Sequence, residues 1–169
     1  MPYKMVFHVD GGCRNNGYSN AYGAAAAVLE NRRGDGYWYK AQALPRGLWN
    51  PTPTNQRAEI TAIMALEWAI EKSRELDTDP YCITDIYFDS QYAVNCFARW
   101  IAKWSRNGWV NSRGVEVANS DLLRKAVPLH NEVFSLGELH YHWVPRHQNA
   151  DADKYCGQIL DELENEYDY

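Results

Sequence analysis

The chain has 169 residues, of which 46% are hydrophobic, and carries a formal net charge of −5 and four cysteines. This length and apolar content suit one domain with a substantial core, and because no run of 18 apolar residues occurs, a transmembrane helix is excluded. The four cysteines are scattered without a Cys-x-x-Cys pair, which argues against a zinc site and predicts reduced thiols in an intracellular compartment, the cytoplasm or the nucleus.

The first part of the chain is typical of three strands and a loop. Residues 4 to 10 predict a strand that starts at once, so we expect no signal peptide or transit sequence, and a turn through Gly11 to Asn20 follows it. Residues 22 to 30 and 36 to 43 predict two more strands. Although alanine favours helices, Gly23 and the short turn after the alanine run favour a strand here. Three prolines between residues 45 and 53 predict a loop.

Helices and strands alternate in the rest of the chain. A helix is predicted from Thr54 or Asn55 to about Glu75, because Thr54 is a good N-cap and isoleucines recur at helical spacing. The remaining predicted elements are a buried strand at 82–88, a helix at 90–104 that ends at Asn107-Gly108, a helix after Asn119, a strand at 138–144 and a helix from about 149 to 166. The order β-β-β-α-β-α-α-β-α predicts an α/β fold, a mixed sheet with helices on both faces.

The negative charge is concentrated near the C-terminal end. From Asp151 onward there are seven acidic residues and one lysine, so residues 1 to 150 carry a net charge of +1. Between Ser90 and Val115 there is no acidic residue, and basic residues alternate with aromatic ones. Such a segment can bind nucleic acid, but by itself it fits slightly better an amphipathic helix with core tryptophans and a solvated basic face. Its members are Arg99, Trp100, Lys103, Trp104, Arg106, Trp109 and Arg113.

Acidic residues stand where the predicted elements begin or end. Asp10 and Asp89 each close a strand, Glu59 lies early in a helix, and Asp151 or Asp153 begins the last helix. Each of them alone fits a turn or a helix N-terminus. If the two strands are parallel neighbours, however, their carboxylates meet at one sheet edge, where like charges repel. A pair of Mg²⁺ or Mn²⁺ ions relieves that repulsion and supports in-line hydrolysis of a phosphodiester.

Four stretches in the same order resemble the motifs of type 1 ribonuclease H, over nearly the whole chain. They are VDGGCRNNG at 9–17, TNQRAEI at 54–60, FDSQY at 88–92 and WVPRHQNADAD at 143–153. The resemblance implies a ribonuclease H-like fold, with a five-stranded mixed sheet whose first three strands form an antiparallel meander and whose others are parallel, flanked by helices on both faces. It also implies an endoribonuclease that hydrolyses the RNA strand of RNA–DNA hybrids by two-metal-ion catalysis, leaving 5′-phosphate and 3′-hydroxyl ends.

The resemblance assigns roles to single residues. The metal-binding carboxylates would be Asp10, Glu59, Asp89 and Asp153, with Asp151 as the alternative to Asp153, and they would hold two Mg²⁺ ions, for which Mn²⁺ can substitute. His147 would be the catalytic histidine of many relatives, but the loop that carries it is several residues shorter here. A catalytic role and a helix-capping role for His147 therefore both stay open.

Other residues would bind the two strands of the substrate. The resemblance implies that Cys13, Asn16, Asn55 and Gln56 lie along the RNA strand, where amides can donate to and accept from a 2′-hydroxyl. On the DNA strand, Trp100 and Trp104 would flank the deoxyribose channel together with Ser112, and Thr54 and Asn119 would hold a phosphate.

The resemblance also bears on organisation and partners. We expect residues 1 to 169 to form one catalytic domain without a separate hybrid-binding domain, acting as a monomer on hybrid duplexes and away from membranes. Two other readings stay open. One is a different nuclease on the same fold, such as a retroelement ribonuclease H domain or a junction resolvase. The other is a non-catalytic hybrid-binding module, against which the clustered carboxylates argue because they would repel phosphate.

Overall fold

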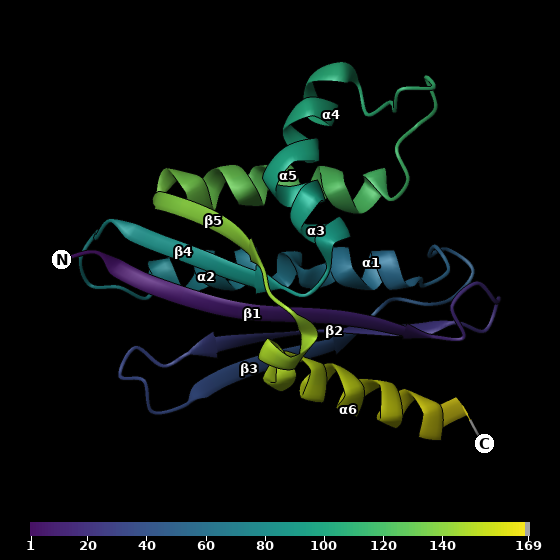
Figure 1. The fold of residues 1–169 in the computed structure, drawn as a ribbon, viewed down its shortest axis with the longest axis horizontal. Coiled ribbons are helices and arrows are strands. Elements are labelled where there is room, and N and C mark those ends of the chain that lie inside the picture. Colours follow the sequence, from purple (N-terminus) through teal and green to yellow (C-terminus); the bar gives the residue numbers. More distant parts are fainter. Residues whose placement is uncertain (168–169) are drawn as a thin grey trace.

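The structure is a computed structural model that describes residues 1–167, and a five-stranded sheet forms its centre (Figure 1). The strand order is β3-β2-β1-β4-β5, with antiparallel pairing among the first three strands and parallel pairing of β1 with β4 and of β4 with β5. The predicted mixed sheet is therefore confirmed. The strands are β1 (Tyr3–Arg14), β2 (Tyr22–Glu30), β3 (Tyr37–Ala43), β4 (Cys82–Phe88) and β5 (Gly137–Trp143).

Helices cover the sheet unequally on its two faces. On one side lie α1 (Asn55–Ile60), α2 (Met64–Arg74) and α5 (Ser120–Ser135), while α6 (Ala150–Tyr167) lies on the other side (Figure 1). The main core fills the space between the sheet and the first group, and Phe7, Leu66 and Leu123 are fully buried in it. A smaller core under α6 contains Cys156 and Leu160. None of the helices in the described part of the chain is long and apolar enough to cross a membrane.

The alanine run in β2 is explained by burial on both faces. Each of the four consecutive alanines, residues 24 to 27, has no exposed surface. Ala25 and Ala27 face the main core, whereas Ala24 and Ala26 face α6. Small side chains are needed because a helix and the main core approach the same strand from opposite sides. The predicted strand is therefore confirmed against the helical propensity of alanine.

The turn predicted from Gly11 to Asn20 starts later than expected, after Arg14, because β1 continues to Arg14 and pairs with the start of β2. Gly11 is needed there for a different reason. A Cβ atom on Gly11 would lie 2.1 Å from the carbonyl oxygen of Ala58, so the backbone of α1 packs directly on the backbone of β1. This contact holds α1 against β1, and it places Glu59 of α1 near Asp10 of β1.

Two predicted helices are interrupted. The helix expected from residue 55 to 75 contains a 3₁₀ turn at Thr61–Ile63 between α1 and α2, and the Thr61 hydroxyl donates to the carbonyl of Arg57 at 2.7 Å. The helix expected after residue 90 consists of α3 (Gln91–Asn95), a π-helical segment (Cys96–Trp100) and α4 (Ile101–Asn107). It ends as predicted at Gly108, whose φ of 81° suits glycine.

Candidate active site

The four carboxylates singled out in the sequence line one cleft of about 620 Å³. Val9 of β1 pairs with Phe88 of the parallel neighbour β4, so the residues that follow them, Asp10 and Asp89, lie side by side. Asp89 comes directly after the end of β4, whereas Asp10 is still within β1 and pairs with Ala26 of β2. Glu59 reaches the cleft from α1, and Asp153 reaches it from the first turn of α6. Four segments far apart in the sequence thus bring carboxylates to one place.

Burial and neighbouring carboxylates raise the pKa of two of these side chains, Asp10 and Glu59. Burial raises the pKa of Asp10 to about 8, together with the charge of Asp89 and a hydrogen bond and charge from Asp153, while the Gly11 N–H, which donates to Asp10 Oδ1 at 3.0 Å, opposes the shift. Burial and the charge of Asp89 also raise the pKa of Glu59, and this is partly opposed by the Ser90 hydroxyl. The cleft therefore has a surplus of negative charge that protons or cations must offset.

Ser90 holds the Glu59 carboxylate in place. Its hydroxyl donates to Glu59 Oε2 at 2.7 Å and accepts the N–H of Ala93 at 3.1 Å as the N-cap of α3. One short side chain therefore fixes the orientation of the carboxylate and the start of the helix that follows β4.

The donor set fits hard divalent cations, because it consists of carboxylate oxygens with a surplus of charge. Among residues 1–167, however, no three His, Cys, Asp or Glu side chains are placed to hold one ion together. The carboxylates line the cleft without enclosing a single point. Small side-chain rotations would be needed to close a coordination shell.

The two aspartates at the start of α6 lie in different places. Asp153 lines the cleft, whereas Asp151 lines a separate cavity of about 440 Å³ on the side of Tyr37. Sequence reasoning missed Arg146, which also lines the cleft and whose Nη2 lies 3.6 Å from Asp153 Oδ1. His147 is exposed in the 3₁₀ turn Arg146–Gln148 and does not line the cleft.

The candidate RNA-strand residues lie beside the acidic cleft. The backbone N–H of Cys13 donates to Asn55 Oδ1 at 3.1 Å, and the backbone N–H of Asn55 donates to Asn16 Oδ1 at 3.0 Å. Cys13 and Asn55 also line the cleft, and Gln56 is exposed next to Asn55. These bonds tie the extended end of β1 to the N-terminus of α1.

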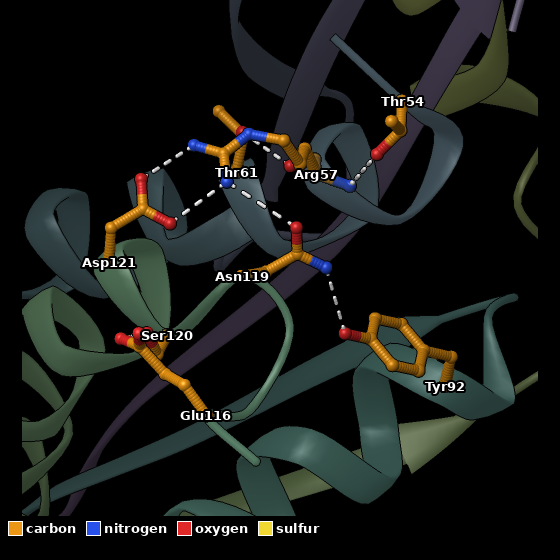
Figure 2. A network of polar contacts seen from close by, with 8 residues as sticks. All are labelled: Thr54, Arg57, Thr61, Tyr92, Glu116, Asn119, Ser120 and Asp121. Atoms are coloured by element: carbon orange, nitrogen blue, oxygen red, sulfur yellow. Dashed lines mark hydrogen bonds and ion pairs between the residues drawn. The ribbon is translucent and has the colours of Figure 1, made fainter. Parts of the chain in front are cut away.

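The candidate DNA-strand residues Thr54 and Asn119 belong to one polar network (Figure 2). Thr54 caps α1 by accepting the backbone N–H of Arg57 at 3.1 Å, and the Arg57 guanidinium reaches Asn119 and Asp121. Asn119 in turn donates to the hydroxyl of Tyr92 at 3.1 Å. Arg57 and Tyr92 belong to two of the sequence motifs, but the sequence did not indicate that both contact Asn119.

The three tryptophans of the basic segment differ in burial. Trp109 is buried in the main core, which fits the alternative in which the tryptophans of this segment are core residues. Trp100 and Trp104 are only partly buried, with ring centroids 5.5 Å apart. Ser112 is exposed in the turn that follows α4.

The chain is similar to known proteins over nearly its whole length. The ribonuclease H (RNase H) family model matches residues 2–162. The Ribonuclease H of Prosthecochloris aestuarii is 31% identical over 162 residues, which is 94% of this chain and 94% of that protein.

Solved structures show the same fold. LC11-RNase H1, isolated from compost by a metagenomic approach, aligns over 95% of this chain and 97% of its own with a TM-score of 0.67 and 20% identity. The foamy viral protease-reverse transcriptase in complex with RNA/DNA hybrid aligns over 92% of this chain and 20% of its own, with a TM-score of 0.64 and 19% identity. With the family model matched from residue 2 to residue 162, and a full-length relative 31% identical, this chain belongs to the ribonuclease H family of nucleases.

Proposed function

We propose that this chain hydrolyses the RNA strand of RNA–DNA hybrids by two-metal-ion catalysis, leaving 5′-phosphate and 3′-hydroxyl ends. The observation that carries the proposal is the acidic cleft at the edge of β1 and β4, found in a chain of the ribonuclease H family. Residues 1 to 169 would act as one catalytic domain. The foamy viral neighbour, which was solved with an RNA/DNA hybrid, supports the choice of substrate.

Asp10, Glu59, Asp89 and Asp153 would hold two divalent cations, Mg²⁺ or Mn²⁺. When bound, such ions supply Lewis-acid stabilisation for the charge that develops on the phosphate and the leaving oxygen. The chain contributes the placement of the carboxylates: Gly11 donates to Asp10, and Ser90 donates to Glu59. Arg146 would leave Asp153 as cations enter, because the two compete for the same carboxylate.

Strand discrimination would come from the two sides of the cleft. On the RNA side, Asn16, Asn55 and Gln56 offer amides that can donate to and accept from a 2′-hydroxyl, beside the backbone of Cys13. On the DNA side, Trp100 and Trp104 offer flat surfaces for deoxyribose. Three further residues, Thr54, Ser112 and Asn119, would bind the DNA backbone there.

A strand-resolved cleavage assay tests the proposal. A hybrid duplex is labelled separately on each strand and incubated with Mg²⁺, beside all-DNA and all-RNA duplexes and a sample containing chelator. We expect cuts in the RNA strand of the hybrid alone, with 5′-phosphate ends, and none with chelator. Cleavage of DNA, or hybrid binding without cleavage under all metal conditions, would contradict the proposal and favour a resolvase or a binding module.

The matched control for this assay is Asp10→Asn, which removes a cleft carboxylate and keeps the side-chain size. Loss of the RNA cuts in this variant excludes a contaminating nuclease.

His147 is also a candidate for proton transfer during the reaction, although it lies outside the cleft.

A further inference from the structure

Two residues outside the proposed substrate contacts, Arg57 and Tyr92, hydrogen-bond to Asn119, and Arg57 also bonds to Thr54. The backbone N–H of Arg57 donates to Thr54 Oγ1 at 3.1 Å, and Arg57 Nη1 donates to Asn119 Oδ1 at 3.4 Å. On its other side, Asn119 Nδ2 donates to the Tyr92 hydroxyl at 3.1 Å, as Figure 2 shows. A helix N-terminus, a loop and a second helix are thus joined through one asparagine amide.

The same connection continues into the aromatic part of the surface. The Tyr92 ring meets Trp100 edge to face with centroids 6.3 Å apart, and Trp100 lies against Trp104 at 5.5 Å. Burial raises the pKa of Tyr92 to about 12, so its hydroxyl stays neutral at pH 7 and can accept from an amide. Tyr92 therefore links the polar and the aromatic halves of the proposed DNA-binding side.

The charge of Arg57 is already compensated within the protein. Its guanidinium donates to both carboxylate oxygens of Asp121, at 2.9 and 2.7 Å, and its side chain is only 12% exposed. The hydrogen bonds from Arg57 hold the pKa of Asp121 below its usual value. A guanidinium held in this way is a rigid fork. Attracting phosphate from solution is not its task.

The rigid fork decides how the Asn119 amide is oriented. Arginine can only donate hydrogen bonds, so the amide oxygen must face Arg57 and the amide nitrogen must face Tyr92. That nitrogen carries two hydrogens, and the one not given to Tyr92 can donate to a phosphate oxygen. Asn119 also has a φ of 63°, a left-handed conformation that asparagine tolerates better than most residues.

From this geometry we infer that Arg57 and Tyr92 are positioning residues, which hold the Asn119 amide with its donor end toward a phosphate of the DNA strand. The inference rests on the proposed function, because it takes Asn119 as a DNA contact. It adds that two side chains that do not touch the substrate set the affinity for it. Without them, the amide can rotate and present its oxygen, which phosphate repels.

Double-mutant cycles on the full chain test this inference. Binding of a short RNA–DNA hybrid is measured with chelator present, and kcat and KM are measured with Mg²⁺, for Arg57→Gln, Tyr92→Phe, Asn119→Ala and the two double variants. We expect Asn119→Ala to weaken binding about tenfold, and Arg57→Gln and Tyr92→Phe about three- to fivefold, as for loss of one hydrogen bond. In each double variant, the loss of binding should be no larger than that of Asn119→Ala alone. The kcat at saturating hybrid should stay within about twofold of the wild-type value.

Arg74→Gln is the matched control, because Arg74 pairs with Glu132 at 3.3 Å on the surface at the far end of α2. It should leave binding unchanged. Circular dichroism checks the fold of each variant, and if Arg57→Gln unfolds, the Tyr92→Phe cycle decides. Rescue of binding by Arg57→Lys would contradict the inference, because a lysine cannot hold the bidentate geometry.

The outcomes separate this inference from the proposed function. Additive effects in the cycle, or unchanged binding in both single variants, would overturn the positioning role while RNA-strand cleavage by the wild type stands. A non-additive cycle without RNA-strand cleavage would support positioning and overturn the proposed reaction. If the wild type does not bind the hybrid, both are overturned.

Discussion

Two aspartates, one in the acidic cleft and one beside the proposed DNA contacts, have pKa values shifted in opposite directions. Asp10 lies among other carboxylates, and its pKa is raised to about 8. Asp121 faces the Arg57 guanidinium, and its pKa is lowered. One side of the molecule thus leaves its negative charge uncompensated until cations arrive, whereas the other is neutralised by its own side chains. Catalysis by bound ions needs the first arrangement, and holding a duplex in register needs the second.

The acidic side should lose its function when one carboxylate is removed. Asp89→Asn takes away a charge and a metal ligand without changing the groove, so we expect cleavage to fall by roughly 1000-fold. Hybrid binding should be preserved or tightened, because less negative charge faces the phosphates. Single-turnover cleavage and hybrid binding measured on the same preparation check this prediction. A parallel loss of binding would show that Asp89 supports the fold rather than the reaction.

The uncompensated charge should also appear in stability. Because the pKa of Asp10 is raised in the folded state, its contribution to stability is fully present below pH 4 and is lost as pH rises toward 8. Asp10→Asn should therefore stabilise the metal-free protein at pH 8 by on the order of 3 kcal/mol and have less effect at pH 5. Urea unfolding with chelator measures the difference. An equal effect at both pH values would mean that burial and the neighbouring carboxylates do not raise the pKa of Asp10.

The neutral side should lose affinity while retaining chemistry. Trp104→Ala should weaken hybrid binding by about 1–3 kcal/mol if the ring stacks on the DNA strand. Trp38→Ala is the control, because Trp38 is half exposed on β3, beside Lys72 and away from the cleft. Equilibrium binding to the hybrid compares the two variants. Unchanged affinity in Trp104→Ala would assign the ring to packing instead.

The smallest effect is expected at His147, in the 3₁₀ turn before α6. His147 is exposed and outside the cleft, so His147→Ala should lower kcat by less than about tenfold, which is below the roughly 100- to 10,000-fold that a positioned general acid or base contributes. A pH profile of kcat in both proteins measures it. A loss as large as that of Asp89→Asn would place His147 among the reacting groups.

Much of the acidic side was predictable from the sequence, because carboxylates at strand and helix ends have positions set by the topology. Once β1 and β4 are parallel neighbours, Asp10 and Asp89 must meet. The extension of β1 past Gly11 was not predictable, since two glycines favour a turn locally and only pairing with β2 overrides this. Arg146 escaped for a similar reason, because its reach into the cleft depends on the fold of a short 3₁₀ turn.

The binding side shows a different limit. The TNQRAEI motif contains Thr54, and the family resemblance implied Asn119, but the contacts of Arg57 with Asp121 and of Asn119 with Tyr92 join residues tens of positions apart. Such pairings depend on how α1, α3 and α5 converge. Nothing in the local sequence pattern specifies them. The break in the predicted helix at Thr61 has a local cause instead, because a hydroxyl bond to the preceding turn competes there with regular helix geometry.

The contact between Gly11 and Ala58 has a consequence for how this protein can change over evolutionary time. The spacing between Asp10 and Glu59 is set by main chain resting on main chain, so it does not depend on the size of any core side chain. Substitutions elsewhere in the interior can therefore accumulate and change the stability of the fold, while the spacing between these two acids stays the same.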